Sequence, residues 1–288
     1  MPQTINTNLA SLNAQRSLSA SQSSLATSMQ RLSSGLRVNS AKDDAAGLAI
    51  AERMNAQVRG MNAAVRNAND GISMAQTSEG SLGKVADALQ RMRELAVQSS
   101  NATNSSSDKD SLDKEFGELA KEIQRVLGAT TFNGKKVLGG DAGPMQFQVG
   151  ANTTGDDTID ITTTNLTIDP TVVAVAGDDN AGTNRGKIDG LQSVLNIHGV
   201  INGIDAALNT VNNERATLGA SQSRFESVIS NLQVSVENQS AARARIMDAD
   251  FAAETAHLSR AQILQQAGNA MVAQANQLPQ QVMRLLQN

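Results

Sequence analysis

The sequence contains no cysteine, tryptophan or tyrosine, and only five phenylalanines and two histidines. Without cysteine the chain can form neither a disulfide framework nor a thiolate metal site. So few aromatic side chains leave alanine, leucine, isoleucine, valine and methionine to build the core. That composition favours thin seams between helices over a bulky globular centre.

Positive charge and long apolar runs are also scarce. The formal net charge is −4 and the pI is near 5.3, which argues against non-specific binding to nucleic acid. No apolar run reaches the roughly 18 residues of a transmembrane helix, so we expect no insertion into a membrane. Residues 1–7 lack the basic and apolar regions of a cleavable signal peptide. We expect any export to use another route.

Residues that could carry out catalysis or bind a metal are few and scattered. His198 and His257 are far apart in the sequence, without an HExxH pattern, and both are expected on helix surfaces. The glycines of 134–150 show no phosphate-binding fingerprint. Helix capping and loop solvation explain the acidic pairs at 43–44 and 156–157 better than metal binding does. We therefore predict no enzyme, no cofactor and no metal site.

The sequence does contain two long apolar seams with a period of 3.5 residues. Positions spaced alternately three and four apart are apolar at eleven of thirteen sites between Met54 and Ala96. The same spacing gives nine apolar sites of eleven between Ile201 and Val236. This period is that of helices paired in a coiled coil. Because a segment of different composition separates the two seams, we expect an antiparallel helical hairpin.

Charged residues inside these seams predict the register of the hairpin. Glu79 and Arg215 occupy core-type positions, where an unpaired charge would cost several kcal/mol. If the numbers of facing residues sum to about 290, Glu79 lies one helical turn from Arg215, and we predict an ion pair. Arg93 has no acidic partner in the seam, so we expect its stem to be packed and its head solvated.

Shorter seams lie at both ends of the chain: Leu18, Leu25, Met29, Leu32 and Leu36 at the amino end, and Leu264, Met271, Ala275, Leu278 and Leu285 at the carboxyl end. The other faces carry serine, glutamine and asparagine with few charges, whereas a solvated helix normally carries lysine and glutamate pairs. Gly35 is expected to end the first helix, and the Ser40–Asp43 pattern to cap the next. These terminal helices have the composition of helices that neighbouring molecules cover.

The middle of the chain has a different character. The long helix should end near Ser99, and a second helix should span about 108–127. The Asn133–Gly134 pair predicts a tight turn, and residues 145–149 and 158–168 predict two short strand regions. Residues 171–187 are expected to form an exposed loop. The predicted fold class is mainly α, an elongated antiparallel helical bundle or coiled coil with a small β-hairpin region in the middle of the chain.

Several long motifs closely resemble bacterial flagellin. They are INTNLASLNAQRSL and RLSSGLRVNSAKDDAAGLAIAERM near the amino end, LQRMRELAVQSSN and TTFNGKKVL in the middle, and RAQILQQAGNAMVAQANQLPQQV near the carboxyl end. The resemblance covers about residues 1–150 and 185–288, with a middle too short for large outer domains. It implies a structural subunit that the flagellar type III apparatus exports unfolded. Outside the cell, that subunit would polymerise into the helical filament of the flagellum for motility.

The resemblance also implies a domain organisation. Residues 1–44 and 246–288 would form the inner coiled-coil layer of a tubular filament. Residues 45–184, with the β and loop region at about 130–184, and the helix of 185–245 would form the next layer. The inner-layer assembly candidates are Leu25, Leu32, Leu264, Met271, Leu278 and Leu285. Implied partners are further copies of the chain, an export chaperone, the filament cap and hook-associated proteins.

One motif implies recognition by a host. LQRMRELAVQ resembles the segment by which many flagellins bind Toll-like receptor 5, and the candidates carried over are Leu89, Gln90, Arg91, Leu95 and Glu115. The heptad pattern places Arg91 outward with Leu95 beside it, which predicts an exposed stripe.

Two alternative functions remain in view. A hook–filament junction protein also resembles flagellin at both ends, although the uninterrupted central motifs favour flagellin. An enzymatic flagellin with a metalloprotease insert is disfavoured because HExxH is missing.

Overall fold

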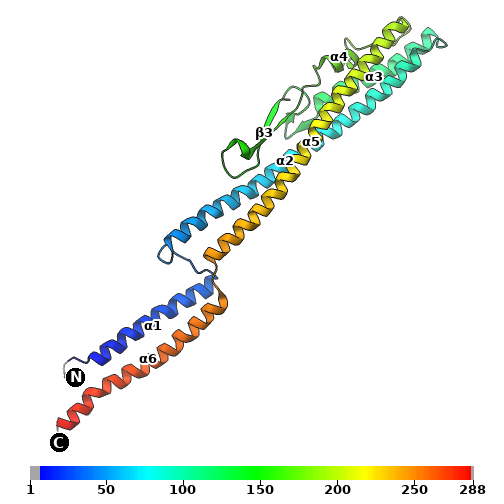
Figure 1. The fold of residues 1–288 in the computed structure, drawn as a ribbon. Coiled ribbons are helices and arrows are strands. Elements are labelled where there is room, and N and C mark those ends of the chain that lie inside the picture. Colours follow the sequence, from blue (N-terminus) through cyan, green and yellow to red (C-terminus); the bar gives the residue numbers. More distant parts are fainter. Residues whose placement is uncertain (1–6, 287–288) are drawn as a thin grey trace. The chain divides into compact units, whose positions relative to one another are not determined.

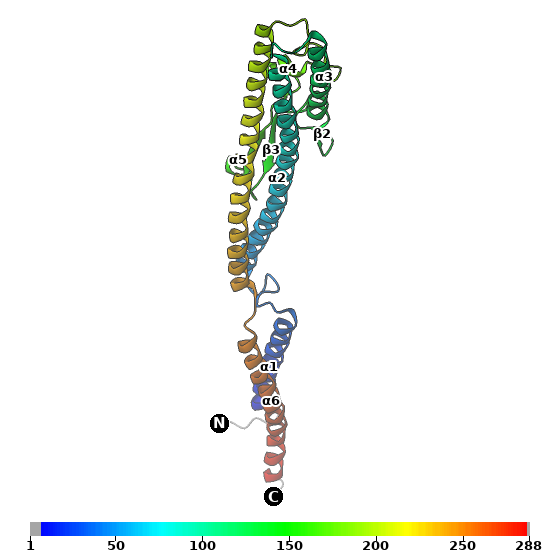
Figure 2. The same cartoon turned by 90° about the vertical axis from the view of Figure 1, so that its right-hand side faces the viewer.

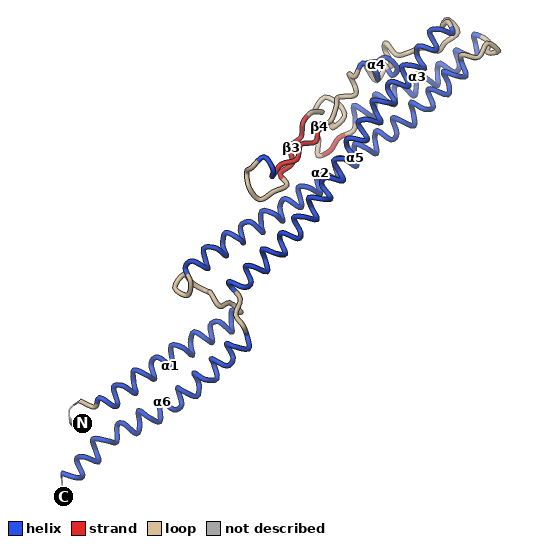
Figure 3. The backbone as a smooth tube through the Cα atoms, in the orientation of Figure 1, coloured by secondary structure: helices blue, strands red, loops and turns tan. Residues whose placement is uncertain are grey.

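The computed structural model describes the backbone of residues 7–286 and the side chains of residues 7–277. Its elements, in chain order, are α1 (Leu9–Ser34), α2 (Ala45–Ser99), α3 (Ser106–Ala129), β1 (Thr131–Phe132), β2 (Lys135–Lys136), β3 (Pro144–Gln148), the short 3-10 helix η1 (Gly155–Asp157), β4 (Thr158–Thr162), α4 (Pro170–Ala176), α5 (Val194–Met247) and α6 (Phe251–Leu286). Helices dominate, and the strands are confined to the middle of the chain (Figure 3). The predicted mainly α class with a small β region is confirmed.

The chain divides into two compact units, which are described separately. The terminal unit comprises Met1–Ala56 and Glu237–Asn288, and the central unit comprises Gln57–Val236. The boundary falls within α2 and α5, so each of these helices contributes to both units. The apolar core lies almost wholly in the central unit.

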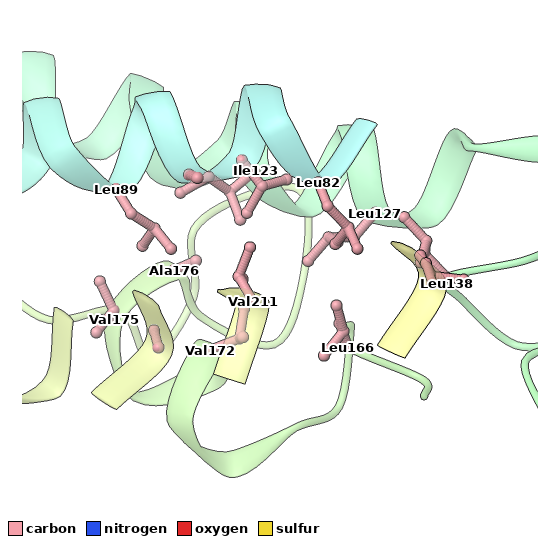
Figure 4. Close-up of a cluster of buried hydrophobic side chains, with 14 of the residues drawn as sticks. Leu82, Leu89, Ile123, Leu127, Leu138, Leu166, Val172, Val175, Ala176 and Val211 are labelled. Atoms are coloured by element: carbon pink, nitrogen blue, oxygen red, sulfur yellow. The ribbon is translucent and has the colours of Figure 1, made fainter. Parts of the chain in front are cut away.

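Three helices and a set of short elements build the central unit. Helices α2 and α5 run antiparallel, and α3 packs beside them (Figure 1, Figure 2). Side chains from all three helices meet those of α4 and the loops in one continuous core, which includes Leu82, Leu89, Ile123, Leu127, Leu138, Leu166, Val172, Val175 and Val211 (Figure 4). The predicted seams lie at this contact, because every seam residue of 201–236 is buried or half-buried.

The register of α2 against α5 differs from the predicted one by about two helical turns. Gly71 of α2 faces Phe225 of α5, and a Cβ placed at Gly71 would lie 2.8 Å from the ring. The ring therefore fits only because residue 71 has no side chain. Phe225 also meets Phe147 edge to face, with ring centroids 5.6 Å apart. One aromatic side chain thus fixes the helix register and anchors β3.

Two small antiparallel sheets lie between α3 and α4 in the sequence. The first pairs β1 with β2 around Asn133 and Gly134, which have φ angles of 49° and 81°, as the Asn-Gly signal predicts. The second pairs β3 with β4. The strand predicted for 158–168 is too long, since β4 ends at Thr162. The carboxylate of Glu214 then accepts the backbone N–H of Thr164 at 2.9 Å and its hydroxyl at 3.1 Å.

The segment expected to be an exposed loop at 171–187 instead contains α4 and part of the core. Pro170 begins the helix, Asp169 caps it through the N–H of Thr171, and Gly177 ends it. Val172, Val175 and Ala176 are fully buried. The prediction was wrong because a helix of two turns is too short to show a clear period.

The helix ends that the sequence predicts are present, except that the cap of α2 lies at a different residue. Gly35 ends α1 with a φ of 72°, and its backbone N–H donates to the carbonyl of Arg31. Ser105 and Asp108 form a reciprocal capping box at α3. The predicted cap at Ser40–Asp43 forms only a turn, in which Asp43 accepts from Ser40. Asp44 caps α2 instead, because its carboxylate accepts the N–H of Gly47 at 2.8 Å.

Candidate interaction surfaces

In the terminal unit, α1 and α6 lie antiparallel and side by side (Figure 1, Figure 2). Small residues at a seven-residue spacing, Ala261, Gly268 and Ala275, form the side of α6 next to α1. A Cβ at Gly268 would lie 3.1 Å from Leu18, and Ala261 and Ala275 are buried. Small side chains let the two helices approach closely, but they bury little apolar surface.

Hydrogen bonds also join α1 to α6. The amide of Asn8 donates to the carbonyl of Ala275 at 2.7 Å, and the hydroxyl of Ser11 donates to Asn276 at 2.7 Å. Beyond the end of α1, Gly35 accepts the N–H of Ala249 at 2.9 Å. Such bonds each contribute only about 1 kcal/mol net, because water competes for the same groups.

Large apolar side chains remain uncovered on both helices. They are Leu9, Leu12 and Met29 on α1, and Phe251, Ile263, Leu264 and Met271 on α6. Among the predicted assembly residues, Leu264 is 51% exposed and Met271 is 64% exposed, whereas Leu25 and Leu32 are half-buried. Leu278 and Leu285 lie outside the described side chains. The predicted carboxyl-terminal seam therefore splits into a small stripe toward α1 and a large, uncovered one.

The α1–α6 pair is also poor in negative charge. Helix α1 contains no acidic residue, and Glu254 is the only one in α6. Glu254 is nearly buried and lies 3.6 Å from Arg31. A groove of about 510 Å³ runs between the helices here, lined by serine, threonine and alanine together with Arg31, Glu254, His257, Arg260 and the half-exposed Leu264. The terminal pair thus presents apolar and uncharged polar surface with a slight positive balance.

On the central unit, the candidate receptor residues divide into exposed and buried sets. The guanidinium of Arg91 donates to Glu115 of α3 at 2.9 Å and to Glu94 at 2.9 Å. The bond to Glu115 raises the pKa of Arg91 above its ordinary value, and the bond to Glu94 adds to this. Gln90 is exposed beside them. The fold therefore brings Arg91 and Glu115 together from different helices.

Leu89 and Leu95 do not belong to that surface. Leu89 is fully buried and Leu95 is 1% exposed, and both lie in the core cluster with Phe116 and Ile123 of α3. The expectation of an exposed stripe at Leu95 was wrong, because α3 covers a second face of α2. A heptad count that considers one partner helix cannot detect such a second contact.

The seam charges give one confirmed prediction and one correction. Glu79 lies 3.9 Å from Arg215, as predicted, and also accepts a hydrogen bond from Gln222 at 3.0 Å. Arg93, expected to be free, donates to both carboxylate oxygens of Asp205, at 2.7 and 3.4 Å. The two-turn difference in register brings Asp205 opposite Arg93. Both side chains are about half exposed, so this pair contributes little to stability.

A half-buried ion pair that the sequence did not predict joins α3 to the segment before α5. Arg185 donates to the carboxylate of Asp113 at 2.5 and 2.9 Å and lies over the ring of Phe116. Burial alone would raise the pKa of Asp113, but the bonds from Arg185 and from the N–H of Ile188 outweigh it and lower the pKa. The acidic residues near the start of α3 gave no signal of this partner.

Within the described part of the chain, no group of three or more histidine, aspartate or glutamate side chains could hold a metal ion. A membrane-spanning helix needs a long apolar stretch, and none of the described helices contains one.

Sequence comparisons with known proteins indicate one family. Residues 5–142 match the model of the bacterial flagellin N-terminal helical region, and residues 201–286 match that of the C-terminal helical region. The chain is 44% identical over 282 residues to a flagellin of Halalkalibacterium halodurans, covering 98% of this chain and 99% of that protein. It is 45% identical over 312 residues to a flagellin of Xenorhabdus nematophila, covering 99% and 100%. A crystal structure of Bacillus cereus flagellin matches with a TM-score of 0.47 and 29% identity, covering 58% of this chain and 88% of that one.

Proposed function

The chain belongs to the bacterial flagellin family, and from that premise we propose how its two units serve a structural subunit of the flagellar filament. It is a short flagellin of 288 residues, because it matches Flagellin A of Vibrio anguillarum almost end to end across an alignment of 378 positions. The relatives reported above are flagellins, and none favours the hook–filament junction alternative. The filament is extracellular.

The terminal unit is the assembly unit in this proposal. The uncovered stripe that contains Leu264 and Met271 carries the argument, since a thin, polar α1–α6 contact leaves large apolar residues in water. Burying such a side chain stabilises an assembly by about 1.5–3 kcal/mol. Further copies of the chain are the partner, and residues 1–44 and 246–288 form the inner layer. A repeated contact that does not close on itself builds an open helical filament.

The central unit is the folded spacer in this proposal, and residues 45–184 and 185–245 form the next layer. Its core is supported by contacts within one chain, which include the Phe225 ring over Gly71. Its exposed Gln90, Arg91 and Glu115 form the candidate surface for Toll-like receptor 5, whereas Leu89 and Leu95 support it from the core. In this proposal the subunit is exported in an unfolded state. Its other proposed partners are an export chaperone, the filament cap and hook-associated proteins.

Substitutions on the uncovered stripe test the assembly proposal. A double variant, Leu12→Gln with Leu264→Gln, should remain a helical monomer and fail to polymerise, because it replaces apolar contact surface on both terminal helices. Electron microscopy of purified full-length protein under polymerising conditions, with circular dichroism, gives the readout. Deletion of residues 1–40 or 250–288 should have the same effect.

The matched control is Ile168→Gln, which makes the same change at an exposed apolar side chain of the central unit. This variant should form filaments like the unchanged protein. Filaments of normal length from the double variant, or from either deletion, would refute the assignment of assembly to the terminal unit.

A further inference from the structure

The methionines of this chain differ sharply in exposure. Four of them, Met61, Met74, Met92 and Met247, are at most 6% exposed, and Met54 and Met145 are half-buried. Met29 is 58% exposed and Met271 is 64% exposed. Among the described side chains, the exposed thioethers are therefore confined to α1 and α6.

These two thioethers are also the most exposed of the readily oxidised groups on the described surface. The chain has no cysteine thiol, indole or phenol to react first. Methionine oxidises to the sulfoxide, and the reaction depends on access to the sulfur. An oxidant in solution should therefore react with Met29 and Met271 faster than with the buried methionines.

We propose that Met29 and Met271 are two separate oxidation-sensitive modification sites, one on each terminal helix, and that their oxidation state decides whether a free subunit can enter the filament. This inference rests on the assembly role proposed above for the terminal helices. The oxidant is a peroxide, with hydrogen peroxide as the simplest member of the class. Unassembled subunits are the vulnerable form, because assembly would cover both residues.

The chemical step transfers one oxygen atom. The sulfur lone pair attacks one oxygen of hydrogen peroxide, a new S–O bond forms, and the O–O bond breaks. The second peroxide oxygen leaves as water after a proton moves to it. The sulfur loses two electrons, the peroxide gains them, and methionine becomes methionine sulfoxide.

The product is incompatible with an apolar contact. A sulfoxide carries a strong hydrogen-bond acceptor, and burying it without a donor is unfavourable. Other large exposed hydrophobic side chains of α1 and α6, such as Leu12 and Leu264, offer the sulfoxide no donor. The core of the central unit is unaffected, because its methionines are shielded. Oxidation therefore blocks assembly without unfolding the central unit.

Peptide mass spectrometry of the full-length monomer after graded hydrogen peroxide tests the first step. Peptides with Met29 and Met271 should gain one oxygen at least about tenfold faster than those with Met74 and Met92, which need local opening to react. Equal rates at exposed and buried methionines would overturn the proposal. This measurement requires no filament, so it stands even where the assembly proposal fails.

Polymerisation of the same samples tests the second step. Oxidised monomer should lose most of its filament yield while keeping its circular dichroism spectrum, and methionine sulfoxide reductase should restore the yield. A double variant, Met29→Leu with Met271→Leu, should polymerise before and after peroxide. It retains Met1 and Met283, so its resistance assigns the loss to the two substituted positions. Full polymerisation of oxidised wild-type protein would overturn the inference, whereas failure of untreated protein to polymerise would overturn the assembly proposal instead.

Discussion

Leu95 shows how an individual residue can be misplaced by a pattern that is otherwise correct. Its neighbours Arg93 and Ala96 belong to the seam with α5, so a single-seam reading places Leu95 toward water. In the structure α3 supplies a second contact, and Leu95 is buried. Arg91 remains exposed and pairs with Glu115. The same motif thus combines a structural residue and a surface residue.

This difference predicts unequal effects of two alanine substitutions. Leu95→Ala should lower the free energy of unfolding by about 2–5 kcal/mol, because it leaves a cavity in the core. Arg91→Ala should leave it almost unchanged, since exposed ion pairs contribute little. Urea unfolding of the two variants measures both values. Equal, small losses would show that Leu95 is not packed as described.

The α1–α6 pair and the register of α2 against α5 show what could be predicted for the elements. Long seams, the Asn133–Gly134 turn and the Gly35 stop all follow from local chemistry, and each is present. The register does not follow, because it depends on a ring that fills the space above Gly71. Helix α4 was missed because its seven residues are too few to show a helical period.

The ion pair between Asp113 of α3 and Arg185 predicts that the free energy of unfolding depends on pH. The pKa of Asp113 is lowered in the folded chain. Its stabilising contribution is therefore complete above the unfolded pKa of about 3.9, and it is lost as the pH falls through the lower folded value. At neutral pH, Asp113→Asn should lower the free energy of unfolding by roughly 1–2 kcal/mol, because it leaves the part-buried Arg185 without its charge partner while solvent still screens the charge.

Thermal unfolding at a series of pH values measures this contribution. The difference between Asp113→Asn and the wild-type protein should shrink steadily as the pH falls below about 4. Glu118→Gln on the same helix, where the carboxylate pairs with Lys121 in solvent, serves as the control and should change little. A difference that stays constant down to pH 2 would contradict the assigned ion pair.

For the whole molecule, the unequal cores of the two units predict unequal protection. The central unit shares one apolar cluster, while the α1–α6 pair depends on small residues and hydrogen bonds. Amide hydrogen exchange in the monomer should therefore be fast across 9–34 and 251–286 and slow in the core-facing parts of 57–236. Assembly into filaments should slow exchange in the terminal helices. Uniform protection in the monomer would show that the terminal unit is stable by itself.

The antiparallel pairing of α1 with α6 also has a mechanical consequence. The described helices reach the two ends of the chain at the same end of this pair (Figure 1), so a force that separates the ends loads its contacts one after another, as in a zipper. Among the described residues, the hydrogen bonds of Asn8 and Ser11 lie nearest that end of the pair, and such short bonds break over a small extension. In the central unit the same pull must lift the Phe225 ring from its seat at Gly71. The α1–α6 pair, which holds the weaker contacts, should therefore open at a lower force than the core of the central unit.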